Sequence, residues 1–156
     1  MNILELINTN LIYLCENIEN YPINIILSLP NYLPYTTMAR MAKYIPHDFI
    51  VKYADQVPME IISKVVPLIE KNIVVELCQK FDEEYTLKCM NYLDYSFVKE
   101  LSDSIPPEYI TNLMNKADKK FIKKMIKNMN RDEEMKCYNH LNKENRKKYK
   151  KYFKYI

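Results

Sequence analysis

The sequence predicts an all-α fold, a solenoid of about eleven single-helix repeats of 12 residues with a capping helix at each end. Three observations predict it: contiguous self-similarity with a period of 12, apolar residues at helical spacing, and the complete absence of glycine. The chain has 156 residues, of which 48% are apolar, so one domain can bury a core.

The repeat runs from Tyr21 to Tyr152 without an insertion. In chain order the segments are YPINIILSLPNY, LPYTTMARMAKY, IPHDFIVKYADQ, VPMEIISKVVPL, IEKNIVVELCQK, FDEEYTLKCMNY, LDYSFVKELSDS, IPPEYITNLMNK, ADKKFIKKMIKN, MNRDEEMKCYNH and LNKENRKKYKKY. Apolar residues recur at positions 1, 5, 6 and 9, which is the stripe of an amphipathic helix and not the alternation of a strand.

Position 2 of the repeat marks where each helix begins. It is Pro, Asp, Glu or Asn, and proline in the first turn costs no hydrogen bond, whereas Asp or Asn can cap the free amides. We therefore expect helices to start near residues 22, 34, 46, 58, 70, 82, 94, 106, 118 and 130. Each helix would have about eight or nine residues and would depend on stacking for its stability.

Position 11 predicts how the chain turns without glycine. It is Asn or Asp in six segments: Asn31, Asp55, Asn91, Asp103, Asn115 and Asn139. Asn is the usual substitute for glycine in the left-handed conformation that ends many helices. We therefore expect this position to be left-handed.

The two ends predict caps on one continuous domain. Residues 1–20 predict one longer amphipathic N-terminal helix, with its apolar face at Ile3, Leu4, Ile7, Leu11, Leu14 and Ile18. Residues 21–140 hold the tandem repeats, and residues 141–156 predict a basic C-terminal capping helix. There, Asn145, Arg146 and Lys147 occupy positions at which core residues are expected.

Segments such as IPPEYITNLMNK, VPMEIISKVVPL and IPHDFIVKYADQ follow the form L-P-x-E-x-x-x-x-L. In this they resemble the short-helix repeats in the cytosolic N-terminal domain of MgtE magnesium transporters and the related right-handed superhelix of the flagellar motor protein FliG. The resemblance covers most of the chain and implies a right-handed superhelix. It also implies an ion-responsive regulatory module as one possible function, but it carries over no ligand residues.

Composition argues against several kinds of chemistry. Walker loops, Rossmann fingerprints and nucleophile elbows all require glycine, which this chain lacks. The only histidines are His47 and His140, and the pair Cys137 and His140 forms half of a tetrahedral metal site. We therefore expect no enzymatic activity, no bound metal and no cofactor.

Cysteine usage and hydropathy indicate a compartment. The four cysteines form no CxxC pair, which favours a reducing, cytoplasmic environment. The longest apolar stretches have only about five residues, far short of a membrane span, and the N-terminus lacks the basic start of a secretory signal.

Charge is concentrated in the last quarter of the chain. Residues 1–116 hold nine Lys or Arg against fifteen Asp or Glu, whereas residues 117–156 hold fourteen against five. The basic residues of this end that could bind anions are Lys119, Lys120, Lys123, Lys124, Lys127, Arg146, Lys147, Lys148, Lys150, Lys151 and Lys154. They form either a solvated cap or a binding site for nucleic acid, an acidic protein or anionic lipid.

Tyrosines offer two further hypotheses. In the tail YKKYFKYI, the residues Tyr149, Tyr152 and Phe153 have helical spacing, which favours docking on a neighbouring helix over stacking with bases. Position 12 is tyrosine in four segments (Tyr32, Tyr44, Tyr92 and Tyr152), so these rings could form an edge that binds a protein.

Together these features predict a binding protein. A protein-binding scaffold or adaptor is the first interpretation, because solenoids offer long surfaces. Binding of nucleic acid or another polyanion through the basic end is the alternative, and the ion-responsive module is the second alternative. The sequence predicts neither the identity of the partner nor the oligomeric state.

Overall fold

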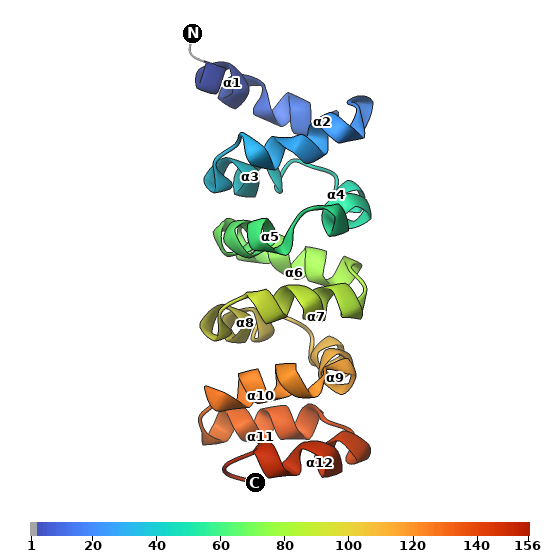
Figure 1. Cartoon of the computed structure of the whole chain (residues 1–156), viewed down its shortest axis with the longest axis vertical. Helices are drawn as coiled ribbons and strands as arrows, with labels where there is room; N and C mark the ends of the chain where they lie inside the picture. Colours follow the sequence, from blue (N-terminus) through green and yellow to red (C-terminus); the bar gives the residue numbers. More distant parts are fainter. Residues whose placement is uncertain (1–2) are drawn as a thin grey trace. The chain divides into compact units, whose positions relative to one another are not determined.

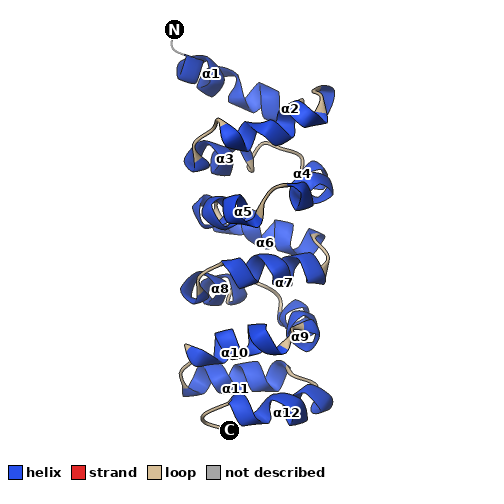
Figure 2. Ribbon diagram, in the orientation of Figure 1, coloured by secondary structure: helices blue, strands red, loops and turns tan. Residues whose placement is uncertain are grey.

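The computed structural model describes the backbone of residues 3–156 and the side chains from Asn10 onward. Within this part, the chain forms α-helices and short 3-10 helices joined by short loops, and it contains no strand (Figure 2). The all-α prediction is confirmed.

The chain divides into two compact units, an N-terminal unit of residues 1–81 and a C-terminal unit of residues 82–156. The N-terminal unit holds α1 (Ile3–Glu16), α2 (Ile23–Ser28), α3 (Tyr35–Met41), α4 (His47–Tyr53), α5 (Met59–Val65) and α6 (Lys71–Lys80) (Figure 1). Its 3-10 helices are η1 (Ile18–Asn20), η2 (Leu29–Asn31), η3 (Ala54–Gln56) and η4 (Val66–Leu68). The C-terminal unit holds α7 (Glu83–Tyr92), α8 (Tyr95–Ser102), α9 (Pro107–Lys116), α10 (Lys119–Lys127), α11 (Arg131–His140), α12 (Lys143–Tyr149) and η5 (Lys150–Tyr152).

The helices begin at an interval of 12 residues along both units. The N-caps of α2 to α12 are Pro22, Pro34, Pro46, Pro58, Glu70, Asp82, Asp94, Pro106, Asp118, Asn130 and Asn142. Every one of them occupies position 2 of its segment. The predicted helix starts are therefore confirmed.

Two kinds of residue begin these helices, by different means. Asp82, Asp118 and Asn142 accept a hydrogen bond from the amide three residues on, and Asn130 forms a full capping box with Glu133. A proline N-cap has no side-chain acceptor, but its carbonyl accepts the first helical bond, as that of Pro58 does from Ile62 N at 3.1 Å and that of Asp118 does from Ile122 N at 3.1 Å. Both solutions satisfy backbone groups at the start of a helix.

The prediction that position 11 is left-handed is wrong. No residue of the described backbone has a positive φ. The chain turns two residues later, through two successive extended residues, such as Ala117 (φ −64°, ψ 140°) and Asp118 (φ −78°, ψ 169°). Because any residue adopts the extended conformation, these corners need no glycine and no substitute for it.

The N-terminal cap is shorter than predicted. α1 ends at Glu16, and after Asn17 the chain forms η1 as a separate 3-10 turn, so residues 1–20 do not make one helix. Leu11 and Ile18 are buried, as expected for the apolar face. The side chains of Ile3, Leu4 and Ile7 lie outside the described residues.

Within each unit, helices pack against the helix two places along the chain. In the N-terminal unit, α1 contacts α3, α3 contacts α5 and α4 contacts α6. In the C-terminal unit, α7 contacts α9 and α9 contacts α11. This packing explains how helices of six to ten residues, which are marginal alone, become stable.

Candidate functional site

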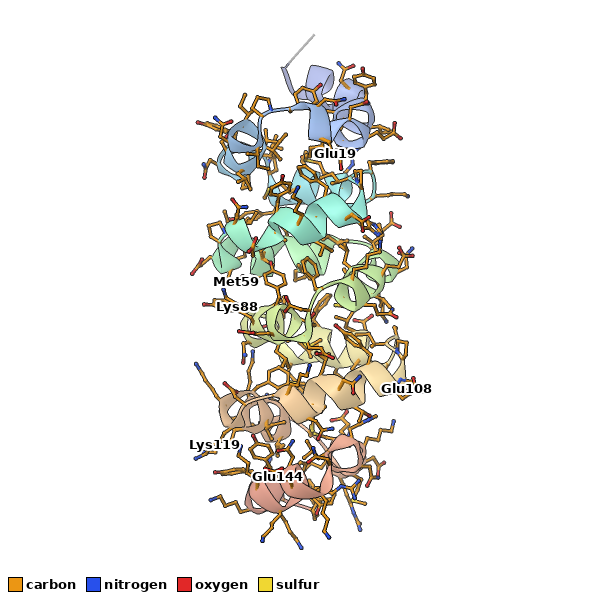
Figure 3. The ribbon with its side chains drawn as sticks, turned by 90° about the vertical axis from the view of Figure 1, so that its right-hand side faces the viewer. Glu19, Met59, Lys88, Glu108, Lys119 and Glu144 are labelled. Atoms are coloured by element: carbon orange, nitrogen blue, oxygen red, sulfur yellow. The ribbon has the colours of Figure 1, made fainter. Side chains whose placement is uncertain are left out.

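Most of the basic residues predicted to bind anions lie exposed on the C-terminal unit. Eight of them form what we call the lysine face: Lys119, Lys120, Lys123, Lys127, Lys147, Lys148, Lys150 and Lys151. Nitrogen-tipped side chains project outward from this end of the chain in Figure 3, where Lys119 is labelled. Among the described side chains, none of these eight lysines forms an ion pair with a carboxylate.

Three of the predicted residues have a structural role instead. Lys124 Nζ donates to Asn91 O at 2.6 Å and to Leu93 O at 3.0 Å, at the C-terminus of α7. Arg146 binds the C-terminal end of α11, and Lys154 Nζ donates to Lys127 O at 3.2 Å. A cation at a helix C-terminus neutralises carbonyls that have no partner within the helix. We therefore exclude these three from the lysine face.

The helix α10 presents its lysines because its other face is apolar and buried. Phe121, Ile122, Met125 and Ile126 face the core. The Asp118 carboxylate begins the helix by accepting from Phe121 N at 2.7 Å. Lys119, Lys120, Lys123 and Lys127 therefore remain on the solvent side, as the amphipathic pattern requires, whereas Lys124 reaches the end of α7.

The aromatic residues of the tail hold the chain against α10 and α11. Tyr149 is 2% exposed, and its hydroxyl donates to Ala117 O at 3.3 Å. Phe153 is buried with its ring centroid 5.3 Å from that of Tyr138. The fully buried Glu134 carboxylate accepts from the amides of Lys154 and Tyr155 at 2.8 and 3.0 Å. Of the tail residues predicted to dock on a neighbouring helix, Tyr149 and Phe153 therefore do so.

Tyr152 lies outside this core and is surrounded by lysines. The ammonium groups of Lys119, Lys123 and Lys151 lie 5.5, 4.8 and 5.3 Å from the centroid of its ring. A hydrogen bond from Lys119 and the positive charges of all three lysines lower the pKa of the Tyr152 hydroxyl below its ordinary value. Two elements, α10 and η5, therefore bring three like charges to one ring.

The four tyrosines predicted to form an edge do not share one environment. Tyr32 is 79% exposed and Tyr92 is 52% exposed. Tyr44 is half-buried against a cluster that includes Leu11 and Met41. Tyr152 belongs to the lysine face.

Sequence reasoning missed an exposed apolar segment in the N-terminal unit. Seven large apolar side chains between residues 12 and 35, which we call the N-terminal apolar surface, are exposed: Ile12, Tyr13, Tyr21, Ile23, Ile25, Tyr32 and Tyr35. The helix α2, with the sequence INIILS, contains no fully buried residue. The signal was present in this sequence, since four of the six residues of α2 are large and apolar and only Asn24 and Ser28 are polar.

The same segment borders an apolar hollow. A depression of about 170 Å³ is lined by residues that include Ile26, Leu27, Met38, Phe49 and Ile62. Its lining is almost wholly apolar, and Ile26 and Leu27 come from α2 itself. The half-buried face of α2 is therefore only loosely covered by this chain.

The C-terminal unit contains a larger cavity, of about 350 Å³. Its walls are mostly apolar, and at its polar side Tyr95 Oη donates to Glu133 Oε2 at 2.9 Å while Lys99 forms an ion pair with Glu133. Burial, the bond to Glu133 and its charge raise the pKa of Tyr95, whereas the pKa of Glu133 is lowered, chiefly by Lys99. These polar groups satisfy one another.

The four cysteines are free thiols, and the pKa values of three of them are raised. Burial raises the pKa of Cys15 to about 11 and that of Cys137 to about 12, and it also raises the pKa of Cys89. In the described part of the chain, no three His, Cys, Asp or Glu side chains are grouped so that they could hold a metal ion. His140 Nδ1 lies 2.8 Å from Thr111 Oγ1.

Comparisons with known proteins supply no relative. The chain matches no family model, no curated protein and no solved structure. Over the described residues, no helix has the length and apolar character that crossing a membrane requires.

Proposed function

We propose that this chain is a non-enzymatic protein-binding scaffold of the α-solenoid type, and that its partner covers the N-terminal apolar surface. Stacks of short helices are suited to this role because they present extended surfaces that no single helix could maintain. The proposal includes a right-handed superhelical winding of the repeats, as the resemblance to the MgtE N-terminal domain implies.

Two features support the solenoid architecture. Each helix from α3 to α12 begins 12 residues after the one before it, so the repeat has no insertion in either unit. Helices also contact the second helix along, as α3 and α5 do in one unit and α9 and α11 do in the other. Regular spacing with contacts only a few repeats apart is typical of solenoids.

The observation that carries the protein-binding proposal is the lack of cover over α2. None of its six residues is fully buried, and Ile23 and Ile25 are 36% and 52% exposed. A helix this short is not stable by itself and depends on burying its apolar side chains. Several exposed aromatic and branched side chains within one short stretch of chain are typical of a surface that binds another protein.

Site-specific photo-crosslinking tests this proposal. A photoreactive phenylalanine analogue at position 32 should give a covalent adduct in an extract of the source cells, and Ile25→Asp should abolish that adduct. The same analogue at Leu68, which is 51% exposed in the same unit but outside the surface, is the control. If position 32 gives no adduct beyond that seen at position 68, the proposal is wrong.

A second measurement separates loss of binding from loss of folding. Ile25 is largely exposed, so Ile25→Asp should change the free energy of unfolding by about 0.5 kcal/mol or less. Urea denaturation followed by circular dichroism measures this change. Retained stability with loss of the adduct assigns the effect to the surface.

A further inference from the structure

The lysines around Tyr152 concentrate positive charge that the chain does not neutralise. Because the three ammonium groups lie within 5.5 Å of one ring centroid, any two of them are within about 11 Å of each other. That upper limit is about the Debye length at 0.1 M salt, so repulsion between the charges is only partly screened. An anion bound among them would relieve this repulsion.

The lysines of the face bind anions as compact point charges. Its eight cations are lysines by definition, and Arg146 is occupied by the carbonyls of α11. Arginine would add bidentate contacts to phosphate and carboxylate alike, whereas lysine binds either anion through its charge. The spacing of the lysines therefore decides which polyanion fits.

The arrangement of the lysines is linear. Lys119, Lys123 and Lys127 are four residues apart on α10, so the row extends about 12 Å along the helix. The segment that carries Lys151 lies beside this row, because Lys119 and Lys123 approach Tyr152 and Lys154 Nζ donates to Lys127 O. Regularly spaced charges along two adjacent elements suit a polymer with regularly spaced phosphates.

The face lacks the features of a membrane-binding surface. Phe121, Ile122, Met125 and Ile126, the large apolar residues of α10, are buried and cannot insert into a bilayer. One exposed ring, Tyr155, follows the lysines and is 52% exposed. An exposed ring beside lysines can stack with a base whose phosphates the lysines hold.

We propose that the lysine face binds single-stranded nucleic acid, with phosphates on the lysines around Tyr152 and a base stacked on Tyr155. This site is separate from the N-terminal apolar surface, and it does not depend on the protein-binding proposal. The affinity would be strongly dependent on salt, because each neutralised phosphate releases a condensed counterion.

Fluorescence anisotropy with labelled oligothymidylate and oligouridylate, at a series of KCl concentrations, tests the proposal on the full chain. Replacing Lys119, Lys123 and Lys151 with Gln should weaken binding. It should also reduce the slope of log K against log salt by about 2, since three contacts at about 0.7 each are lost. An unchanged slope would overturn the proposal.

A charge-matched control variant replaces Lys52, Lys64 and Lys88 with Gln. All three are exposed and lie outside the lysine face, and the net charge changes by the same amount. This variant should keep the slope of the unmodified chain. Equal losses in both variants would mean that only net charge matters and would overturn the site.

One further variant and three other ligands test which class of ligand the face binds. Tyr155→Ser should weaken single-strand binding by about 5- to 150-fold while leaving the salt slope unchanged. A duplex, polyglutamate and phosphatidylserine vesicles, each at the same salt, should bind more weakly than the oligonucleotides. No effect of Tyr155→Ser, or equal or tighter binding of any of these three, would overturn the assignment to single-stranded nucleic acid.

Discussion

The two compact units share one repeat but begin and end their helices differently. In the N-terminal unit, α2 to α5 start at prolines and have six or seven residues. In the C-terminal unit, all helices but α9 start at Asp or Asn, and α7 to α11 have eight to ten residues. The 12-residue interval therefore tolerates different helix lengths.

Proline explains the end of two of the short helices, α2 and α5. Pro30 and Pro67 lie at the ends of α2 and α5, where the chain tightens into η2 and η4. A proline inside an α-helix removes a backbone hydrogen bond and collides with the preceding turn, so the α-helix ends before it. The remaining residues of the segment then form a 3-10 turn, which keeps the repeat length constant.

The units also differ in what they bury. Five of the seven large side chains that are essentially inaccessible lie in the C-terminal unit, whereas the exposed large apolar residues cluster between residues 12 and 35. Side-chain hydrogen bonds between helices, such as Thr86 with Tyr109 and Asn115 with His140, connect the C-terminal unit. A regular repeat thus specifies helix starts without guaranteeing equal coverage of the core. We expect the C-terminal unit to be the more stable one.

The largest expected difference concerns position 6 of the repeat. Ile122→Ala should lower the free energy of unfolding by about 2 to 5 kcal/mol, because Ile122 is fully buried and its loss leaves a cavity. Ile62→Ala at the matching position of the N-terminal unit should cost less than half as much, because Ile62 is only half-buried. Urea denaturation measures both. Equal costs would contradict the proposed difference between the units.

Position 11 gives the next largest effect. The Asn115 side chain donates to His140 O at 2.9 Å and accepts from Asn142 N at 2.7 Å. Asn115→Ala leaves those backbone groups without partners and should cost about 1 to 3 kcal/mol by the same measurement. Asn31→Ala, at the same position of the N-terminal unit, should stay within about 0.5 kcal/mol because Asn31 is exposed. A comparable loss for Asn31→Ala would show that position 11 acts locally and not through these contacts.

A smaller effect is expected at the N-caps. Asp118→Ala should cost about 1 kcal/mol, because its carboxylate accepts from Phe121 N at 2.7 Å. Asp94→Ala is the control, since Asp94 is also an N-cap but its side chain makes no capping hydrogen bond. Thermal melts followed by circular dichroism should rank Asp118→Ala below Asp94→Ala in stability. The reverse order would remove side-chain capping as a support of the C-terminal unit.

The smallest expected difference between the two units is in the rate at which their thiols are labelled. Single-cysteine variants should label slowly at neutral pH, and Cys15 should react faster than Cys137, because the N-terminal unit opens more easily. A difference of about 1.4 kcal/mol in opening corresponds to a tenfold difference in rate. Faster reaction of Cys137 would reverse the order of stability between the units.

A pH dependence of the free energy of unfolding, measured by urea denaturation at a series of pH values, follows from the raised pKa values. Burial raises the pKa of Cys137 from 9.0 to about 12, so the unfolded chain releases this proton at a lower pH than the folded one. The stabilising effect is complete below pH 9 and is lost as pH rises toward 12. Cys15 should show the same loss over a narrower range, toward 11.

Much of the fold could be predicted from local rules. Proline, Asp or Asn at position 2 predicted each helix start, because the groups that begin a helix lie within a few residues of one another. The same local reasoning failed at position 11. It assigned Asn115 to a left-handed corner, whereas Asn115 belongs to α9 and its side chain binds α11, 25 residues away.

The basic end shows where the sequence stopped being informative. Counting charges identified the lysines, and nine of the eleven predicted cations are exposed, eight of them without a bond to a distant carbonyl. Which cations are used elsewhere depended on distant carbonyls, as with Lys124 and Asn91, which are 33 residues apart. Sequence spacing cannot place such pairs, because nothing local relates a side chain to a backbone group that far away.

What the sequence by itself determined about this protein is its helical repeat and the excess of lysine in its last quarter, since both follow from local spacing and composition. Only the tertiary structure decided that α2 remains uncovered and that Lys119, Lys123 and Lys151 converge on Tyr152. Both features depend on tertiary packing, because burial and the approach of like charges depend on which helices become neighbours in space.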